Sequence, residues 1–365
     1  MMNGQSFPAE YKNGTENSKN GISHDYFQFA ISHERKARII HLLKMGIWLY
    51  FLLLIFEGAL RKWILPFLST PLLIARDPLA LWLVLLSWRE GLLPRNKYVS
   101  YMVFFATVGI ITTIFFGHGN AGVAIYGARI LLFHFPLMFV FAAIFDRDDV
   151  IKMGKITLLI AIPMTLLITA QFYSPQTALV NKGVGGDTDG GGFEGALNFM
   201  RPPGTFSFTN GVTLFYNLVG CFVFYFWLNP KGVNRKILIG VTLGLCASIP
   251  LSISRGLFFQ VALTLVFTLI AVSRKPKYAG KMIFAIMGGF VVFAFLSQTS
   301  FFQTATEAFS ARFETANRVE GGLQGVLIDR YMGGMFGALA DSENKPFFGA
   351  GMGMGTNVGA MMLTG

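Results

Sequence analysis

Residues 39–56 read IIHLLKMGIWLYFLLLIF, and this stretch decides the fold. A helix of that length spans about 27 Å, close to the ~30 Å hydrocarbon core of a bilayer. Eight further apolar stretches follow at 72–88, 98–117, 121–145, 156–174, 210–228, 237–253, 256–272 and 282–297. The sequence therefore predicts an all-α, polytopic transmembrane helical bundle with about nine spans.

The composition of the 365-residue chain supports this fold class. It is 53% hydrophobic and only 13% charged, with a mean hydropathy of +0.54, whereas soluble domains carry about 25% charged residues. Cys221 and Cys246 both lie in apolar stretches, which excludes a disulfide framework or a cysteine-based metal site. The chain has no phosphate-binding loop, paired-histidine zinc helix or serine-triad pattern, so we expect neither metal nor cofactor.

The net charge of +11 indicates orientation. With the N-terminus inside, the inner segments hold 19 of the 30 basic and 8 of the 19 acidic residues, and they account for the whole net charge. Cytoplasmic loops retain Lys and Arg, so this pattern predicts a membrane protein with a cytoplasmic N-terminus. Because the basic residues are scattered between apolar stretches, we expect no nucleic-acid partner.

Three regions are expected along the chain. Residues 1–38 are polar and predict a disordered cytoplasmic tail, residues 39–297 form the transmembrane domain, and residues 298–365 lie on the outer, periplasmic side. Apolar residues recur at helical spacing over 302–313 and 323–339, which predicts two amphipathic helices on the outer face. The chain then ends in a glycine-rich run without a returning span, which indicates truncation.

Eleven basic residues do not fall on the inner side, and eight of them are arginines: Arg61, Arg76, Arg129, Arg201, Arg255, Arg312, Arg318 and Arg330. A cation at the bilayer centre costs about 3 kcal/mol or more, so a structural or functional role is needed to explain why these arginines lie in or beyond the membrane. The guanidinium group is permanently charged and matches phosphate oxygens two at a time. An outward set of arginines suits a lipid-linked phosphate or pyrophosphate.

Ion pairing is the alternative role for several of these arginines. Arg76 adjoins Asp77, so a structural pair and a ligand contact are both open there. Arg129 lies within a span without an acid one helical turn away, which leaves function and structure equally open. Arg330 lies among acidic residues, where a solvated helix face is favoured, as for Arg312 and Arg318. Arg76, Arg129 and Arg330 remain candidates for substrate binding.

Arg201 and Arg255 are the candidates for catalysis. Arg201 begins Arg201-Pro-Pro-Gly-Thr-Phe at the outer mouth of the sixth span, where prolines stiffen the backbone and Gly204 permits close approach. Arg255 occupies the short outer turn between the seventh and eighth spans. Neither has a nearby acid in the sequence, which favours a functional role for both.

Three short motifs carry a family resemblance: Arg201-Pro-Pro-Gly-Thr-Phe-Ser-Phe-Thr-Asn210, Ser254-Arg255-Gly256 and Asn344-Lys-Pro-Phe-Phe-Gly-Ala-Gly-Met-Gly353. In their order and spacing, and with the run of spans, the chain resembles the O-antigen ligase and O-antigen polymerase family of bacterial envelope proteins. The resemblance implies a location in the bacterial inner membrane. The resemblance implies a metal-independent, inverting glycosyltransferase whose donor is an undecaprenyl-pyrophosphate-linked glycan and whose acceptor is a glycan or lipid. It also implies that Arg201 and Arg255 hold the pyrophosphate.

The general base is the feature in which the chain departs from the resemblance. Family ligases use a histidine in a large outer loop, but the five histidines here are His24, His33, His41, His118 and His134, none of which follows the fifth span. His118 lies at an outer mouth and fits a turn residue better than a base, and His134 fits a hydrogen-bonded histidine within the bundle. Alternative bases are Glu194, Glu314 and Glu320, or a residue beyond the end of the chain.

Two rival functions remain open from the sequence. A transporter or flippase of a lipid-linked or anionic solute also needs intramembrane charges such as Arg129. The other rival is a non-catalytic membrane assembly factor. Membrane lipids are expected partners under each hypothesis.

Overall fold

The computed structural model describes residues 17–230, 232–273, 280, 287–289, 291, 294–295, 298–320, 332–340 and 347–364. Its first half contains α1 (Asn17–Ala59), η1 (Leu60–Ile64), η2 (Pro66–Leu68), α2 (Ser69–Leu73), α3 (Arg76–Arg89), α4 (Lys97–Phe116), α5 (Ala121–Arg129), η3 (Ile130–His134), α6 (Phe135–Ile144), α7 (Arg147–Tyr173) and η4 (Leu179–Asn181). Its second half contains β1 (Phe193–Ala196), β2 (Phe199–Arg201), α8 (Thr209–Leu228), α9 (Arg235–Leu251), α10 (Arg255–Ser273), α12 (Ser300–Glu320), α14 (Gly334–Ala340) and α15 (Asn357–Thr364).

Seven helical segments in the described part of the chain are long and apolar enough to cross a membrane: Glu34–Ile64, Pro66–Arg89, Lys97–Phe116, Ala121–Ile144, Arg147–Tyr173, Thr209–Leu228 and Arg255–Ser273. The fold is therefore that of a helical, multi-pass membrane protein. These segments match seven of the predicted spans. The predicted span at 237–253 corresponds to α9, a 17-residue helix that is shorter than the others. The predicted span at 282–297 lies largely outside the described residues.

The predicted disordered tail at 1–38 is wrong for its second half. Helix α1 begins at Asn17 and continues without a break to Ala59, whereas residues 1–16 lie outside the described residues. Extending an existing helix adds one hydrogen bond for each residue that is fixed, so a polar segment joined to a stable membrane span needs no costly new nucleus. The polar composition that predicted disorder does not capture this effect.

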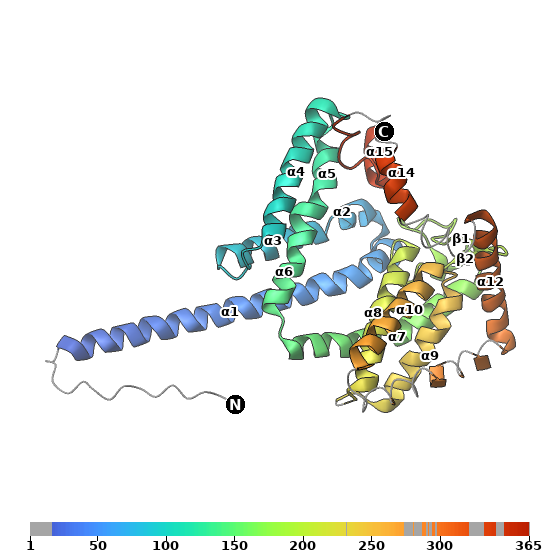
Figure 1. Ribbon diagram of the computed structural model, residues 1–365, viewed down its shortest axis with the longest axis horizontal. Helices are drawn as coiled ribbons and strands as arrows, with labels where there is room; N and C mark the ends of the chain where they lie inside the picture. Colours follow the sequence, from blue (N-terminus) through green and yellow to red (C-terminus); the bar gives the residue numbers. More distant parts are fainter. Residues whose placement is uncertain are drawn as a thin grey trace.

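The helices form two apolar cores that share α1. In the first core, buried side chains of α7, α8, α9 and α10 meet the end of α1 and the small residues Ala305 and Ala308 of α12. In the second core, α1 packs on α3 and α6 through Leu43, Leu83 and Val140. Figure 1 shows α7 to α10 gathered with α12 at one end of the view, while α1 runs from this group past α3 and α6.

Helix α12 is the first of the two predicted amphipathic helices. Its Phe309 and Phe313 contact Phe258, and Phe313 also contacts Phe259, so aromatic rings join α12 to α10. The second predicted helix, at 323–339, lies partly outside the described residues, and α14 covers its end. Packing on the bundle rather than exposure to solvent therefore explains the apolar face of α12.

A cluster of charged residues joins the middle of α1 to the first turn of α7. Lys44 pairs with Asp149 and, at 3.0 Å, with Asp146, which caps α7 in a reciprocal capping box with Asp149. The backbone N–H of Asp149 and the Lys44 ammonium together hold the pKa of Asp146 below its usual value. Arg35 and Glu90 form a further pair, at 3.1 Å, between α1 and the end of α3. Lys44 and Arg35, two of the basic residues that the sequence assigns to the inner side, are thus paired with acids.

A small β-hairpin interrupts the helical architecture between α7 and α8. Strands β1 and β2 pair antiparallel, with Phe193 opposite Arg201. The two residues between them, Leu197 and Asn198, both have positive φ (51° and 64°), the geometry that a tight two-residue hairpin turn requires. The all-α prediction missed this hairpin because its strands are too short to show a period-2 pattern.

Gly58 of α1 is the point of closest approach between this helix and the segment that follows the hairpin. A Cβ atom added at Gly58 would lie 2.4 Å from the backbone nitrogen of Ser207 and 2.4 Å from the carbonyl oxygen of Thr205. Both neighbours are backbone atoms, which cannot rotate away as a side chain can. The segment 202–207, here called the motif loop, can therefore lie this close to α1 only because residue 58 is a glycine without a side chain.

We expect the substitution Gly58→Ala to lower the free energy of unfolding by about 1–3 kcal/mol, because the motif loop must move away from α1. Thermal unfolding of the detergent-solubilised protein, followed by tryptophan fluorescence, measures the change. The matched control is Gly240→Ala in α9, where an added Cβ meets nothing within 4 Å and alanine favours the helix by about 1 kcal/mol. Equal melting temperatures for the two variants would contradict the close approach.

Candidate functional site

Arg201 and Arg255 are brought together by the hairpin. Arg201 ends β2, and Arg255 is the first residue of α10. Gly195 of β1 lies against the Ile253 side chain, at 2.7 Å from an added Cβ to Ile253 Cδ1, so the hairpin packs on the turn that precedes α10. Tertiary packing thus brings two arginines that lie far apart in the sequence close to each other.

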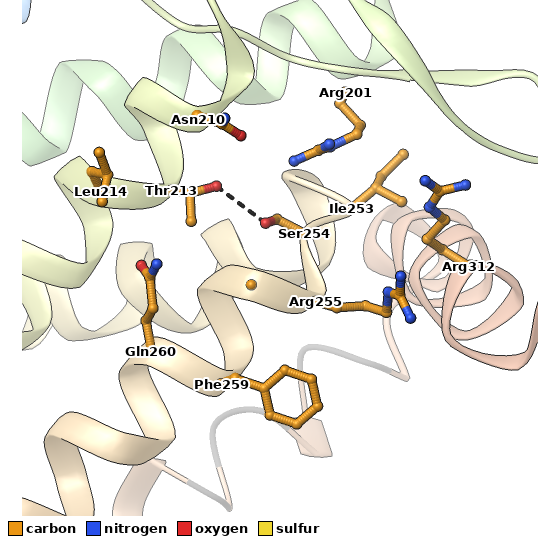
Figure 2. Close-up of a pocket in the computed structure, with 11 residues that line it drawn as sticks. Arg201, Asn210, Thr213, Leu214, Ile253, Ser254, Arg255, Phe259, Gln260 and Arg312 are labelled. Carbon is orange, nitrogen blue, oxygen red and sulfur yellow. Dashed lines mark hydrogen bonds between the residues drawn. The ribbon is translucent and has the colours of Figure 1, made fainter. Parts of the chain in front are cut away.

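Both arginines line a cavity of about 340 Å³ at the end of the bundle. Its other lining residues are Asn210, Thr213, Leu214, Ile253, Ser254, Gly256, Phe259, Gln260 and Arg312. Figure 2 shows the three arginines around the turn that carries Ile253 and Ser254, with each one contributed by a different element: β2, α10 and α12. Three guanidinium groups and the neutral polar side chains among the described lining residues suit an anionic ligand.

The start of α10 adds to this positive character. The Ser254 hydroxyl accepts from the backbone N–H of Leu257 at 3.2 Å, which is an N-cap, and shares a hydrogen bond with Thr213 of α8 at 3.1 Å. Arg255 and Gly256 therefore lie in the first turn of a 19-residue helix, where the helix dipole and the backbone N–H groups favour anions. Chain direction reverses at α9, so α8 and α10 run parallel and both begin at this end.

Ile253 has a strained backbone. Its φ is +47°, a region that a β-branched residue adopts only when the surrounding structure holds it there. Ile253 is 1% exposed, between the hairpin and the bundle. Backbone strain of this kind costs about 1–3 kcal/mol and clusters at functional sites, which agrees with the placement of Arg255 two residues later.

The motif loop is fixed from both sides by buried polar groups. Gly204 donates its N–H to Gln171 Oε1 at 2.7 Å, and its carbonyl accepts from Gln171 Nε2 and from Lys62 Nζ, both at 3.3 Å. The Thr205 hydroxyl donates to the carbonyl of Ile55 at 2.7 Å. These contacts fix the backbone at Gly204 and Thr205, three and four residues after Arg201, and so hold the motif loop in place beside the hairpin.

We expect Gln171→Leu to destabilise the protein by about 1–3 kcal/mol, because the substitution keeps the volume but leaves the buried N–H of Gly204 without this acceptor. Chemical or thermal unfolding of the solubilised protein measures the loss. The exposed Gln303 of α12 provides the control, since Gln303→Leu should change stability by less than about 0.5 kcal/mol. Equal stability of the two variants would show that the hydrogen bonds between Gln171 and Gly204 do not contribute to the stability of the protein.

Of the three other arginines predicted to bind substrate, the two that the structure describes, Arg76 and Arg129, lie elsewhere. Arg129 donates to Asp77 at 2.7 Å and to the Tyr126 hydroxyl at 2.9 Å, so its acid partner comes from α3 and not from its own helix. Arg76 pairs with Glu57 of α1, not with the adjoining Asp77. Arg330 lies outside the described residues. Neither Arg76 nor Arg129 lines the cavity that contains Arg201 and Arg255.

Arg312 is a lining residue that the sequence did not single out. Its helix carries both acids and bases, so its charge pattern indicated a solvated face. The signal that could have identified it is the apolar stripe of α12: Phe309 and Phe313 flank Arg312 and pack on α10. A residue between two packed aromatics lies close to the surface that they cover.

His118 and His134 hold structural positions. His118 Nδ1 accepts from the N–H of Asn120, and the Nε2 nitrogen lies 3.0 Å from the carbonyl of Met352, so both ring nitrogens have hydrogen-bond partners. His134 lies between the Tyr50 hydroxyl and Asp77, at 2.9 and 3.0 Å. Neither histidine lines the arginine cavity.

The described carboxylates that the sequence offers as general bases lie outside the lining of the cavity that contains Arg201 and Arg255. Glu194 of β1 and Glu314 of α12 are exposed and are not among the lining residues of the cavity. The side chain of Glu320 lies outside the described set.

The described part of the glycine-rich motif, 347–353, packs on α4 and α5. Met352 N–H donates to the Thr113 hydroxyl at 2.8 Å, and Phe348 stacks on Phe116. An added Cβ at Gly127 would lie 2.5 Å from the backbone nitrogen of Gly353, and Gly353 itself has a φ of +88°. Gly353 of this motif therefore serves close backbone packing.

The fold and the cavity define a class: a helical, multi-pass membrane protein with an arginine-lined cavity at one end of its bundle. The chain matches no family model, no curated protein and no solved structure. Among the residues that the structure describes, no group of three or more His, Cys, Asp or Glu side chains is placed to hold a metal ion.

Proposed function

We propose that this protein is a glycosyltransferase of the bacterial inner membrane, with its N-terminus in the cytoplasm. It transfers or polymerises a glycan from an undecaprenyl-pyrophosphate carrier at the outer face. The observation that carries the proposal is the shared cavity of Arg201 and Arg255 at the start of α10. Two planar cations and a helix N-terminus are the groups that recognise a diphosphate.

The proposed reaction needs no cofactor from the chain. The acceptor hydroxyl oxygen forms a bond to the anomeric carbon as the bond between that carbon and the pyrophosphate oxygen breaks. The electron pair leaves with the lipid pyrophosphate, and the proton of the hydroxyl passes to a base. Arg201 and Arg255 stabilise the negative charge that grows on the leaving group, and they are most effective where water is excluded.

The location of the cavity agrees with an outer-face reaction. Arg201 and Arg255 lie at the end of the bundle where α8 and α10 begin, opposite the end where Lys44, Asp146 and Asp149 meet. If the basic end faces the cytoplasm, the cavity faces the periplasm, where no nucleotide sugar is expected. A donor there must carry its own activated leaving group.

The test is formation of a glycosidic bond. Membrane vesicles from cells that lack the chain should accumulate lipid-linked donor, and vesicles that contain it should yield a longer or transferred glycan together with free undecaprenyl pyrophosphate, both measured by mass spectrometry. Disappearance of donor from one leaflet without a new glycosidic bond would reject transfer.

A transporter or flippase is the second candidate, and one observation favours it. Asp77 bridges Arg129 and His134 within the membrane-spanning helices, and His134 contacts Tyr50. Connected intramembrane ionisable groups of this kind also occur in proton-coupled transporters. The vesicle assay separates the two candidates, because a flippase moves the donor across the bilayer and leaves its glycan unchanged.

A further inference from the structure

A second cavity, of about 320 Å³, lies beside the first and differs from it in character. It is lined by Phe51, Leu54, Ile55, Glu57, Gly58, Arg61, Leu73, Arg76, Phe206, Ser207, Phe208, Gly211, Leu214, Phe215 and Leu218, and is here called the lateral groove. Its walls are mostly apolar, and its charged residues are confined to one end. Leu214 lines both cavities, so they share a wall.

The charged end of the lateral groove carries more positive than negative charge. Arg61 and Arg76 both pair with Glu57, which is 5% exposed. Arg61 directs its other N–H groups to the Ser69 carbonyl at 2.7 Å and the Ser207 hydroxyl at 2.9 Å. Arg76 contacts Glu57 through Nε, and its side chain remains 27% exposed. Among the described lining residues, one carboxylate therefore faces two guanidinium groups, an arrangement that one additional anion would neutralise.

The apolar part of the groove has the length of one bilayer leaflet. Phe51 and Arg61 lie ten residues apart on one helical segment, or about 15 Å along its axis, half of the ~30 Å hydrocarbon core. The rim is open to the side: Leu54, Phe208 and Leu214 are 45%, 50% and 61% exposed. In a membrane-spanning bundle such side chains face lipid. A chain could enter the groove from the bilayer with its head at the level of Arg76.

We propose that the lateral groove binds an anionic phospholipid from the surrounding leaflet. The phosphodiester contacts Arg76 and Arg61, and one acyl chain lies along Leu54 and Leu218. The single negative charge of the headgroup complements the surplus cation, and the groove length matches the chain. This assignment is independent of the transfer reaction, although Leu214 places the bound lipid against the wall of the arginine cavity.

Native mass spectrometry of the full detergent-purified chain tests the proposal. The protein is titrated separately with phosphatidylglycerol, phosphatidylcholine and undecaprenyl phosphate. We expect one phosphatidylglycerol to bind at concentrations at least about tenfold lower than phosphatidylcholine. Both lipids carry a phosphodiester, but the choline cation cancels the net charge of phosphatidylcholine and is repelled by Arg61 and Arg76. Equal affinity for the two phospholipids, or binding of undecaprenyl phosphate in preference to phosphatidylglycerol, would overturn the proposed occupant.

Two variants locate the bound lipid. Arg76→Gln removes the exposed cation while Glu57 keeps its contact to Arg61, and it should weaken phosphatidylglycerol binding by about tenfold. Arg89→Gln, at the opposite exposed end of α3, should leave binding unchanged. Leu54→Trp fills the apolar half without altering charge and should also weaken phosphatidylglycerol binding by about tenfold or more. It decides the question if Arg76→Gln does not fold.

Arg255→Ala distinguishes the two cavities. We expect this variant to bind phosphatidylglycerol as the wild type does, because Arg255 lines the other cavity. Loss of phosphatidylglycerol binding in Arg255→Ala, or normal binding in Leu54→Trp, would place the lipid outside the lateral groove and overturn the proposal. Glycan transfer is not part of this measurement, so failure of the proposed enzymatic function leaves the result interpretable.

Discussion

Alanine at either Arg201 or Arg255 should reduce glycan transfer by about 10²–10³-fold while the amount of protein in the membrane stays the same. Loss of one preorganised group that stabilises transition-state charge typically has an effect of this size. Arg201 and Arg255 are both partly exposed and line the cavity, so truncation removes the proposed contact to the leaving group and leaves the helical core in place. Transfer in membrane vesicles, normalised to protein abundance, gives the measurement.

Further substitutions separate the function of the guanidinium group from simple charge. Arg255→Lys keeps the positive charge but loses the planar fork, so transfer should recover only in part. Combining Arg201→Ala with Arg255→Ala should cost less than the product of the two single effects, because both groups act on one leaving group. Arg235→Ala is the control, since this exposed arginine begins α9 at the opposite end. Wild-type transfer by both single alanine variants would reject the proposed function.

Removal of the Asp77 carboxylate should destabilise the protein by about 3–5 kcal/mol, the typical cost of leaving one member of a buried ion pair without its partner. Asp77 and Arg129 are only 14% and 18% exposed, and Asp77 also holds His134. Asp77→Ala therefore leaves a permanent cation inside the membrane domain. A lower melting temperature of the solubilised protein and reduced abundance in the membrane are the expected readouts.

The paired substitution supplies the counter-test. Replacing both partners, with Asp77→Leu and Arg129→Met, should recover most of the lost stability, because an apolar pair of similar volume removes the desolvation cost. Glu34→Gln breaks the exposed pair between Glu34 and Arg38 and should change stability by less than about 1 kcal/mol. If the paired variant is stable but fails to act on donor in vesicles, the Asp77 network has a role beyond stability.

These two predictions concern arginines with different surroundings. Arg129 is neutralised by an acid from a neighbouring helix, whereas Arg255 is presented to a cavity by a capped helix N-terminus. The pairing of Arg129 is typical of a cation with a structural role, and the placement of Arg255 is typical of a cation that binds an anionic ligand. The contrast explains why substitution of Asp77 should act mainly on stability and substitution of Arg255 mainly on transfer.

Hydropathy predicted the spans well because the signal is local. A run of about twenty apolar residues is sufficient to form a helix that satisfies its own backbone in lipid, and seven such segments are present in the described chain. The same local logic failed at residues 17–38, where helix formation depends on the neighbouring span. It also missed the hairpin of β1 and β2, whose strands gain stability only from the bundle on which they pack.

The sequence alone determined that this is a helical membrane protein, and it made Arg201 and Arg255 candidates by their charge at the mouths of apolar spans. Only the tertiary structure decided which charges neutralise one another: Arg129 pairs with Asp77, and Arg76 pairs with Glu57. It also placed Arg312 in the lining of the cavity that contains Arg201 and Arg255. Span formation depends on consecutive residues, whose hydrophobicity can be summed directly. Ion pairing depends on distances between residues far apart in the chain, and those distances are fixed only when the helices and the hairpin pack together.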